Sequence, residues 1–215
     1  MIPILIVIIL IFFQIPWFLR DKTNINKSVN VIPLNTSFFT TLLSLMFIIT
    51  RNTFYSTLVY AIFIVGLLVD FIYTIVYYPK YADPLIIMIH HPFYIFFSLY
   101  VLSINNITLF TLFFLQELPT FVLNIKRYYN IKDINIEYLF GFLFFLFRII
   151  YHIHICYHLQ DLILENKVFS GVAALSFILH CYWFYGWFCK NIKKNNKINK
   201  IKKPNKIKKI KKIKK

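Results

Sequence analysis

The sequence contains few charged residues and few cysteines. Charged side chains make up 15% of the 215 residues and hydrophobic side chains 59%, a balance that excludes an ordinary water-soluble domain. Cys156, Cys181 and Cys189 lie in or at the end of apolar runs without paired spacing, which argues against a disulfide framework or a zinc knuckle. The chain also lacks an internal repeat and a separate polar domain. The sequence therefore predicts an integral membrane protein.

Seven apolar runs approach the roughly 20 residues that a helix needs to cross a bilayer. They predict an all-α, polytopic membrane protein, a bundle of about seven transmembrane helices. The first run has no basic segment before it and no small-residue cleavage site after it, so we interpret it as a retained helix and not as a signal peptide. The second run is the least apolar, because its first half is polar. The runs cover residues 3–19, 33–50, 56–78, 84–103, 107–125, 137–159 and 168–189.

The basic residues between these runs predict the orientation of the chain. Cytosolic loops carry an excess of lysine and arginine. With the N-terminus outside and the C-terminus in the cytosol, seven basic residues of the loops face the cytosol and two face outward, before the lysine-rich tail is counted. The inner set is Arg20, Lys22, Lys27, Lys80, Lys126, Arg127 and Lys132, and the outer set is Arg51 and Lys167.

Several ionisable residues interrupt the apolar runs. A charge at bilayer depth costs at least about 2.5 kcal/mol on insertion scales, so each of them is a candidate functional residue. Counting inward at about 1.5 Å per residue places most of them roughly 9–14 Å below the cytosolic surface and Arg148 slightly deeper. Pro92 and Pro119 lie close by, where kinks would free backbone carbonyls. We therefore expect a shared polar cavity, open toward the cytosolic leaflet. The residues at this depth are Asp70, His90, His91, Glu117 and His180.

Simpler structural roles are also open to these residues. His90 and His91 point about 100° apart on a helix, so one could face the cavity while the other hydrogen-bonds a neighbour. Glu117 could neutralise Arg148, since buried charges survive mainly in pairs. Asp70 could orient a histidine without taking part in chemistry.

Five short motifs occur in an order that resembles the TLC-domain family. This family contains the ceramide synthases, the translocation-associated membrane proteins and a group of smaller TLC-domain proteins with lipid-handling roles. The resemblance covers about residues 30–190 and is closest to the smaller proteins. The motifs are GLLVDFIY with Asp70, IMIHHPF with His90 and His91, ELPTFVLNIKR with Glu117 and Asn124, FLFRIIYH with Arg148, and YWFYGW.

The resemblance implies a transmembrane bundle in the endoplasmic reticulum or a derived membrane, with a role in lipid metabolism, lipid sensing or membrane lipid homeostasis. In ceramide synthases the His-His pair is thought to serve N-acylation of a sphingoid base by acyl-CoA. Acyl-CoA is thus the implied co-substrate here, and no bound cofactor or metal is expected. Ceramide synthases carry a His-Asp pair about one helix later, where this chain has Gln116 and Glu117, as the smaller proteins do. The resemblance implies that His90 and His91 are catalytic, and Asp70 and Glu117, which lie at a similar depth, complete the predicted catalytic set. The predicted lipid-binding residues are Arg148, Asn124 and His180.

The resemblance also implies a division of the chain into three parts. Residues 1–29 would form an N-terminal transmembrane helix and loop, and residues 30–190 the TLC-like transmembrane domain. Residues 191–215 would form a polybasic cytosolic tail.

Two other functions are compatible with the same sequence. His154 and His158 are four residues apart, a helical spacing that can bind zinc when a third ligand comes from elsewhere. With His152 nearby, the chain is similar to seven-helix zinc-dependent lipid amidases, although by depth these histidines lie toward the opposite leaflet from His90 and His91. The other alternative is a non-catalytic protein that binds or chaperones lipid in the same cavity.

The tail from Lys190 to Lys215 predicts a contact with membrane lipids. It carries 14 lysines interleaved with isoleucine and asparagine. Each basic residue near an anionic leaflet contributes about 1 kcal/mol, so we expect this segment to lie on the cytosolic surface. A basic tail tethered to a membrane is more often an orientation signal and lipid contact than a nucleic-acid site, and no nucleic-acid partner is expected.

Overall fold

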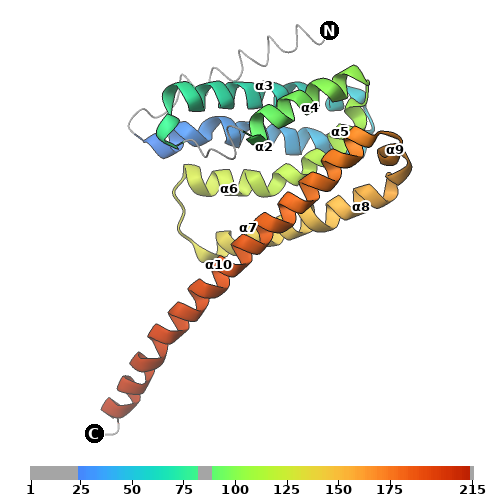
Figure 1. Ribbon diagram of the computed structural model, residues 1–215. Helices are drawn as coiled ribbons and strands as arrows, with labels where there is room; N and C mark the ends of the chain where they lie inside the picture. Colours follow the sequence, from blue (N-terminus) through green and yellow to red (C-terminus); the bar gives the residue numbers. More distant parts are fainter. Residues whose placement is uncertain (1–23, 82–88, 214–215) are drawn as a thin grey trace. The chain divides into compact units, whose positions relative to one another are not determined.

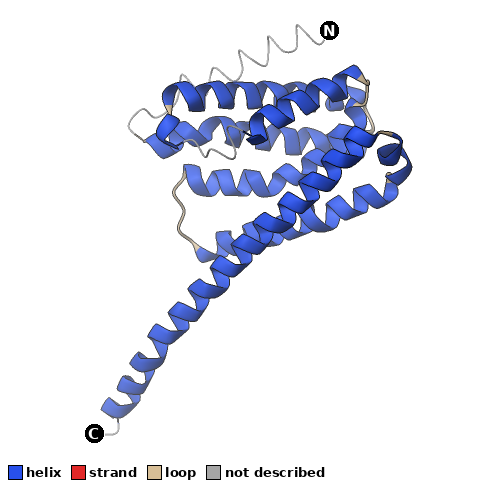
Figure 2. Ribbon diagram, viewed as in Figure 1, coloured by secondary structure: helices blue, strands red, loops and turns tan. Residues whose placement is uncertain are grey.

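The computed structural model describes residues 24–81 and 89–213, and every regular element in these ranges is helical (Figure 2). The described chain forms two compact units, Met1–His158 and Leu159–Lys215. The all-helical class predicted from the sequence is therefore confirmed for these residues. The predicted run at 3–19 and the first residues of the run at 84–103 lie outside the described residues.

The first unit contains helices α2 to α8 and the second contains α9 and α10 (Figure 1). Short 3-10 segments at Pro79–Tyr81 and Phe113–Glu117 (η1 and η3) and a π-helical segment at Phe145–Ile150 (η4) separate some of them. The helices are α2 (Ile25–Thr50), α3 (Thr53–Tyr77), α4 (His91–Ser103), α5 (Ile107–Leu112), α6 (Leu118–Tyr128), α7 (Ile134–Phe144), α8 (Tyr151–His158), α9 (Gln160–Glu165) and α10 (Lys167–Ile213).

Five helical stretches of the described chain are long and apolar enough to cross a membrane. Helix α4 is a shorter apolar helix of 13 residues. These six stretches correspond to the second to seventh apolar runs of the sequence, and the count of seven transmembrane helices stays a prediction. The five long stretches are Lys27–Thr50, Thr53–Tyr77, Ile107–Tyr128, Ile134–His158 and Lys167–Asn191.

Helix α2 forms despite the polar first half of its run, because its polar side chains bond to its own backbone. Thr36 Oγ1 donates to the Ile32 carbonyl at 3.0 Å, and Thr40 Oγ1 to the Thr36 carbonyl at 2.7 Å. Back-bonding of this kind satisfies a hydroxyl where water is absent. The polar run therefore folds as a helix that begins at Ile25, eight residues before the predicted boundary at 33.

Contacts between neighbouring helices define an antiparallel arrangement in the first unit. Tyr60 Oη donates to the Ser98 carbonyl at 3.0 Å, which joins the middle of α3 to α4. Ser44 Oγ of α2 donates to the Thr111 carbonyl of α5 at 2.8 Å. Hydrogen bonds from small polar residues of this kind help to hold helices together in an apolar surrounding. Helix α3 supplies much of the core, since Val59, Tyr60 and Val65 are almost fully buried.

Helices α2 and α3 approach closely at Gly66. A Cβ atom at this position would lie 2.7 Å from Thr36 Cγ2 and closer still to the Thr36 hydroxyl. Ordinary van der Waals contact needs more than 3.4 Å. The glycine therefore permits the close packing of these two helices.

We expect Gly66→Ala to destabilise the protein by about 1–3 kcal/mol, the usual effect of overpacking a well-packed site. Thermal unfolding in detergent micelles, followed by tryptophan fluorescence, measures this. Gly171→Ala is the matched control, because a Cβ there meets nothing within 4 Å. Adding Thr36→Ala to Gly66→Ala should restore part of the loss. Equal unfolding temperatures for the two single variants would contradict the close approach.

Candidate functional site

The first polar cluster joins Asp70, late in α3, to the two histidines at the start of α4. His91 Nε2 lies 3.0 Å from Asp70 Oδ2, and the His91 residue is only 4% exposed. An ionised carboxylate can only accept, so with Asp70 ionised Nε2 of His91 is the donor in this contact. The His90 ring lies beside it, with its centroid 5.7 Å from that of His91 and 4.7 Å from that of Tyr94.

Local sequence explains why the histidines begin a helix. Pro92 follows them directly and occupies the first turn of α4, where its missing N–H removes no helical hydrogen bond. Because α3 and α4 are antiparallel, the start of α4 lies beside the last part of α3. This pairing brings together Asp70 and His91, which are 21 residues apart in the chain.

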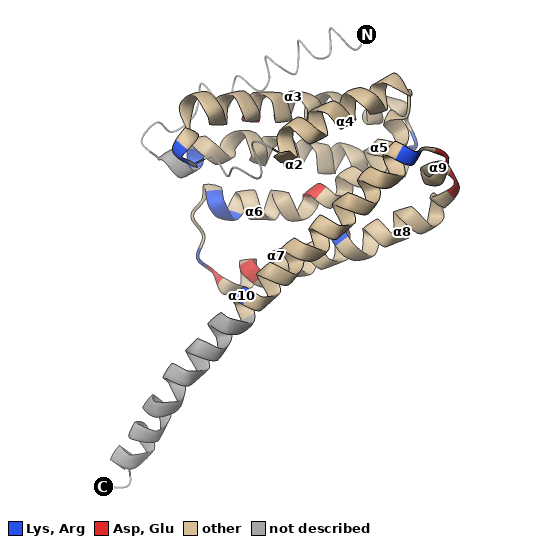
Figure 3. Cartoon of the chain, in the orientation of Figure 1, with Lys and Arg blue, Asp and Glu red and all other residues tan. Residues whose placement is uncertain are grey.

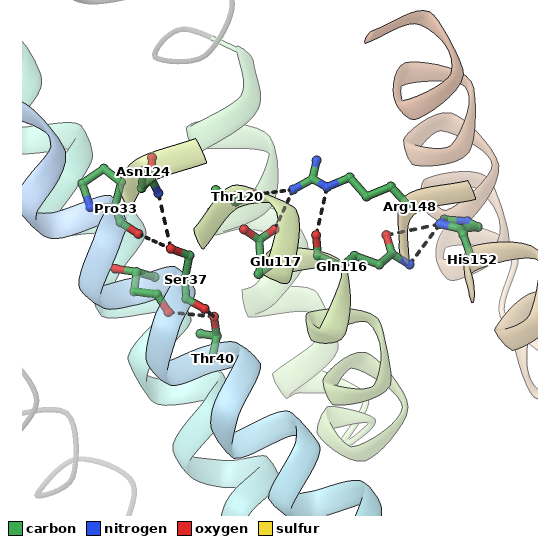
Figure 4. Close-up of polar contacts among 10 residues, drawn as sticks. Pro33, Ser37, Thr40, Gln116, Glu117, Thr120, Asn124, Arg148 and His152 are labelled. Atoms are coloured by element: carbon green, nitrogen blue, oxygen red, sulfur yellow. Dashed lines mark hydrogen bonds and ion pairs between the residues drawn. The ribbon is translucent and has the colours of Figure 1, made fainter. Parts of the chain in front are cut away.

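The second polar cluster surrounds Arg148, which lies in the π-helical segment η4. Its Nε donates to the Gln116 carbonyl at 2.9 Å, and its Nη2 contacts Glu117 Oε1 at 3.1 Å and Thr120 Oγ1 at 2.6 Å (Figure 4). The Arg148 side chain is 11% exposed and that of Glu117 26%. Figure 3 shows that most charged residues of the first unit lie at helix ends or in connections, whereas this pair lies within two long apolar stretches.

Pro119 explains the acceptor that Arg148 uses. The segment before it is a 3-10 helix, in which the Leu118 N–H bonds to the Leu115 carbonyl. By the same i to i+3 pattern the Gln116 carbonyl would accept from residue 119, but proline has no N–H. The Gln116 carbonyl thus has bonding capacity left for the Arg148 guanidinium. The sequence predicted that Pro119 would free a backbone carbonyl in the interior, and the Gln116 carbonyl is this group.

The Gln116 side chain extends the cluster to His152 on α8. Its Nε2 lies 3.1 Å and its Oε1 3.3 Å from His152 Nδ1, and both residues are buried. In the shorter contact the amide donates to Nδ1, which leaves the ring proton on Nε2. Arg148 and His152 are four residues apart and therefore both reach the segment around Gln116.

Asn124 lies two turns further along the same stretch and contacts α2. Its Nδ2 donates to Ser37 Oγ at 3.3 Å, and Ser37 Oγ donates to the Pro33 carbonyl at 2.7 Å (Figure 4). Both Asn124 and Ser37 are buried. The contact joins α6 to α2, so the geometry gives Asn124 a role in helix packing.

No family model, no curated protein and no solved structure matches this chain. The first cluster offers a histidine held by a carboxylate, an arrangement that suits proton transfer. The second offers a guanidinium held in a fixed position, which suits hydrogen bonding to an oxygen acceptor.

The structure brings together some of the candidate residues and separates others. Asp70, His90 and His91 form one cluster, and Glu117 and Arg148 form the other. Tyr94, which lies against His90, and Phe114, two residues before Gln116, both contact the Phe63 ring, so the two clusters share a neighbour on α3. It is Asp70, and not Glu117, that is hydrogen-bonded to His91. His180 belongs to the second unit.

The histidines considered for zinc binding lie in two different surroundings. The rings of His154 and His158 are adjacent, with centroids 4.3 Å apart, but His152 is turned toward Gln116. Within residues 24–81 and 89–213, no group of three or more His, Cys, Asp or Glu side chains is placed to hold a metal ion.

Sequence reasoning named Asn124 as a lipid-binding residue and noted Gln116 only in the comparison with ceramide synthases, and it missed Thr120. Gln116, Thr120 and Asn124 are spaced four residues apart, and this spacing places them on one face of a helix. Ser37 and His152 were noted only as a polar residue and as part of a histidine group. The regular spacing of polar residues in an apolar run was the signal that could have identified this face.

Proposed function

We propose that this chain is an integral membrane protein that transfers acyl groups to lipid acceptors, as an acyl-CoA-dependent N-acyltransferase of the TLC-domain type. The hydrogen bond between His91 and Asp70 carries the proposal. A neutral imidazole oriented by a carboxylate is a common general base, and here it lies in an apolar surrounding with His90 beside it. The order of the five motifs supports the same assignment.

In this proposal seven helices cross an endoplasmic-reticulum-like membrane, with the N-terminus luminal and the C-terminus cytosolic. The loop lysines and arginines support this orientation through the positive-inside rule. The clusters then lie in the cytosolic half of the bilayer, where acyl-CoA arrives. The lysines after residue 190, on the continuous helix α10, would attach to anionic lipids of the cytosolic leaflet.

The proposed reaction follows from the proton position in the His91–Asp70 pair. When the Nε2–H of His91 donates a hydrogen bond to Asp70, the neutral ring has its lone pair on Nδ1. This nitrogen would take the proton from the lipid amine as the amine attacks the thioester carbonyl carbon. The new C–N bond forms, the C–S bond breaks, and the same proton passes to the thiolate of CoA. Atoms and charges balance without a further reactant.

The test is comparative lipid mass spectrometry of cells that express the wild-type chain or His90→Ala/His91→Ala at matched membrane levels. We expect a lipid amide that rises with the wild type and not with the double variant. The matched control is His154→Ala/His158→Ala, which removes two exposed histidines outside both clusters. We expect this control to retain the product.

The other outcomes exclude the proposal in recognisable ways. A lipid amide that falls with the wild type and not with the His154/His158 variant would favour a zinc-dependent lipid amidase. Identical lipid profiles from a correctly inserted wild type and both variants would favour a protein that binds or chaperones lipid without turnover.

A further inference from the structure

The guanidinium of Arg148 uses only part of its hydrogen-bonding capacity. Nε and Nη2 are both engaged, with the Gln116 carbonyl and with Glu117 and Thr120. Nη1 has no hydrogen-bond partner among the described residues, and Figure 4 shows it directed away from the other contacts. The fully buried polar side-chain atoms that lack a partner in the described chain do not include Nη1, so this nitrogen is accessible and is a candidate ligand contact.

The other contacts hold Nη1 in a fixed position. The planar guanidinium cannot rotate without breaking the hydrogen bonds of Nε and Nη2. The Phe144 ring lies against the same group, with its centroid 5.3 Å from Cζ. The Arg148 residue is only 9% exposed. A ligand that accepts from Nη1 would therefore lose little free energy in ordering this side chain, because the protein already holds it in place.

The charge balance around Arg148 indicates what kind of ligand fits. Glu117 lies 3.1 Å from Nη2 and neutralises the guanidinium. A phosphate or another anion would be repelled by this carboxylate, which favours a neutral oxygen acceptor. In a lipid-facing surrounding the common neutral acceptor is the carbonyl of an acyl group. Phe63 contacts both Tyr94, which lies against His90, and Phe114, close to Gln116, so the acceptor would lie in the same part of the first unit as the proposed base.

We propose that Arg148 Nη1 donates a hydrogen bond to the acyl carbonyl oxygen of the bound substrate. This deepens the proposed function and depends on it for the acyl nature of the ligand. The hydrogen bond would draw electron density from the carbonyl carbon and so favour attack by the amine. Arg148 is then a substrate-contacting residue, and Glu117 is a positioning residue that holds it.

The test compares ligands that differ only in the carbonyl. Purified protein in micelles is titrated with palmitoyl-CoA, a thioester, and with hexadecyl-CoA, the thioether that lacks the carbonyl. A second pair, diester and diether phosphatidylcholine, tests a membrane lipid as the source of the carbonyl. A charge-assisted hydrogen bond should make the carbonyl ligand of one pair bind about 10- to 100-fold more tightly.

The variant for this test is Arg148→Leu/Glu117→Leu, which removes the ion pair without leaving a buried charge. We expect it to bind both members of each pair equally. A wild type that does not discriminate in either pair overturns the proposal, as does a double variant that keeps the discrimination. Competition by inorganic phosphate at Arg148 would assign the site to an anion and overturn it as well.

The same titration separates this inference from the proposed reaction. Binding requires no turnover, so it can be repeated with His90→Ala/His91→Ala. If carbonyl discrimination persists while no lipid amide forms even with the wild type, the inference stands and the transferase proposal fails. If the amide forms without carbonyl discrimination, the role of Arg148 fails alone.

Discussion

Replacing Glu117 with leucine is expected to lower the free energy of unfolding by about 3–5 kcal/mol. The substitution would leave the Arg148 guanidinium buried without its carboxylate, and an uncompensated buried charge is among the most destabilising changes in a protein. Denaturant titration in mixed micelles measures the effect. It is the largest stability effect that we expect from a single substitution in the first unit.

A second ion pair of the same unit serves as the matched control. Lys126 and Glu137 are also in contact and connect the ends of α6 and α7, but the cation that Glu137 neutralises is 24% exposed, whereas the Arg148 side chain is 11% exposed. We expect Glu137→Leu to change stability by about 0–1 kcal/mol, because a pair near the surface is screened. Adding Arg148→Leu to Glu117→Leu should recover most of the lost stability. Equal losses in the two single leucine variants would contradict the burial argument.

Replacing Asp70 with asparagine is expected to lower the turnover number of the proposed acyl transfer by about 10²–10⁴-fold, the usual contribution of an oriented general base. Asparagine has the shape of aspartate but cannot hold the Nε2 proton of His91 by charge. The KM for acyl-CoA should change little, because Asp70 positions the base and does not contact this substrate. Initial rates of lipid amide formation at saturating acyl-CoA measure the effect.

Two further variants test whether the effect of Asp70→Asn depends on the carboxylate at this position. Asp133→Asn is the control, since Asp133 is an exposed residue that caps α7 through the Asn135 N–H and asparagine caps equally well. Asp70→Glu keeps the carboxylate and should recover part of the turnover. An Asp70→Asn rate close to wild type would remove Asp70 from the mechanism.

The positions of most helices could be predicted from the sequence, because a helix that crosses a membrane needs an apolar run of about its own length. The runs at 56–78 and 107–125 correspond to the stretches Thr53–Tyr77 and Ile107–Tyr128. Helix α9 (Gln160–Glu165) was not predicted, because six residues are too few to show a hydrophobic period. The early start of α2 was missed because its polar residues argue against a membrane helix by composition. Their hydrogen bonds to the preceding turn exist only once the helix has formed.

The candidate residues were predictable by type but not by partner. Asp70, His90, His91, Glu117 and Arg148 were recognisable because ionisable groups are rare in apolar runs. Which carboxylate contacts which base was open, since several lie at a similar predicted depth. The Gln116–His152 contact was not expected, because an uncharged amide gives a weaker signal than a charge.

The sequence by itself determined the helical class, the approximate spans and the unusual ionisable residues, because these depend on local composition and period. Only the tertiary structure decided that Asp70 binds His91, that Glu117 binds Arg148, and that Nη1 of this guanidinium has no hydrogen-bond partner among the described residues. Those pairings depend on the antiparallel packing of α3 with α4 and of α6 with the stretch Ile134–His158. They also depend on a π-helical segment that turns Arg148 inward, and neither feature is encoded in the spacing of residues along a single helix.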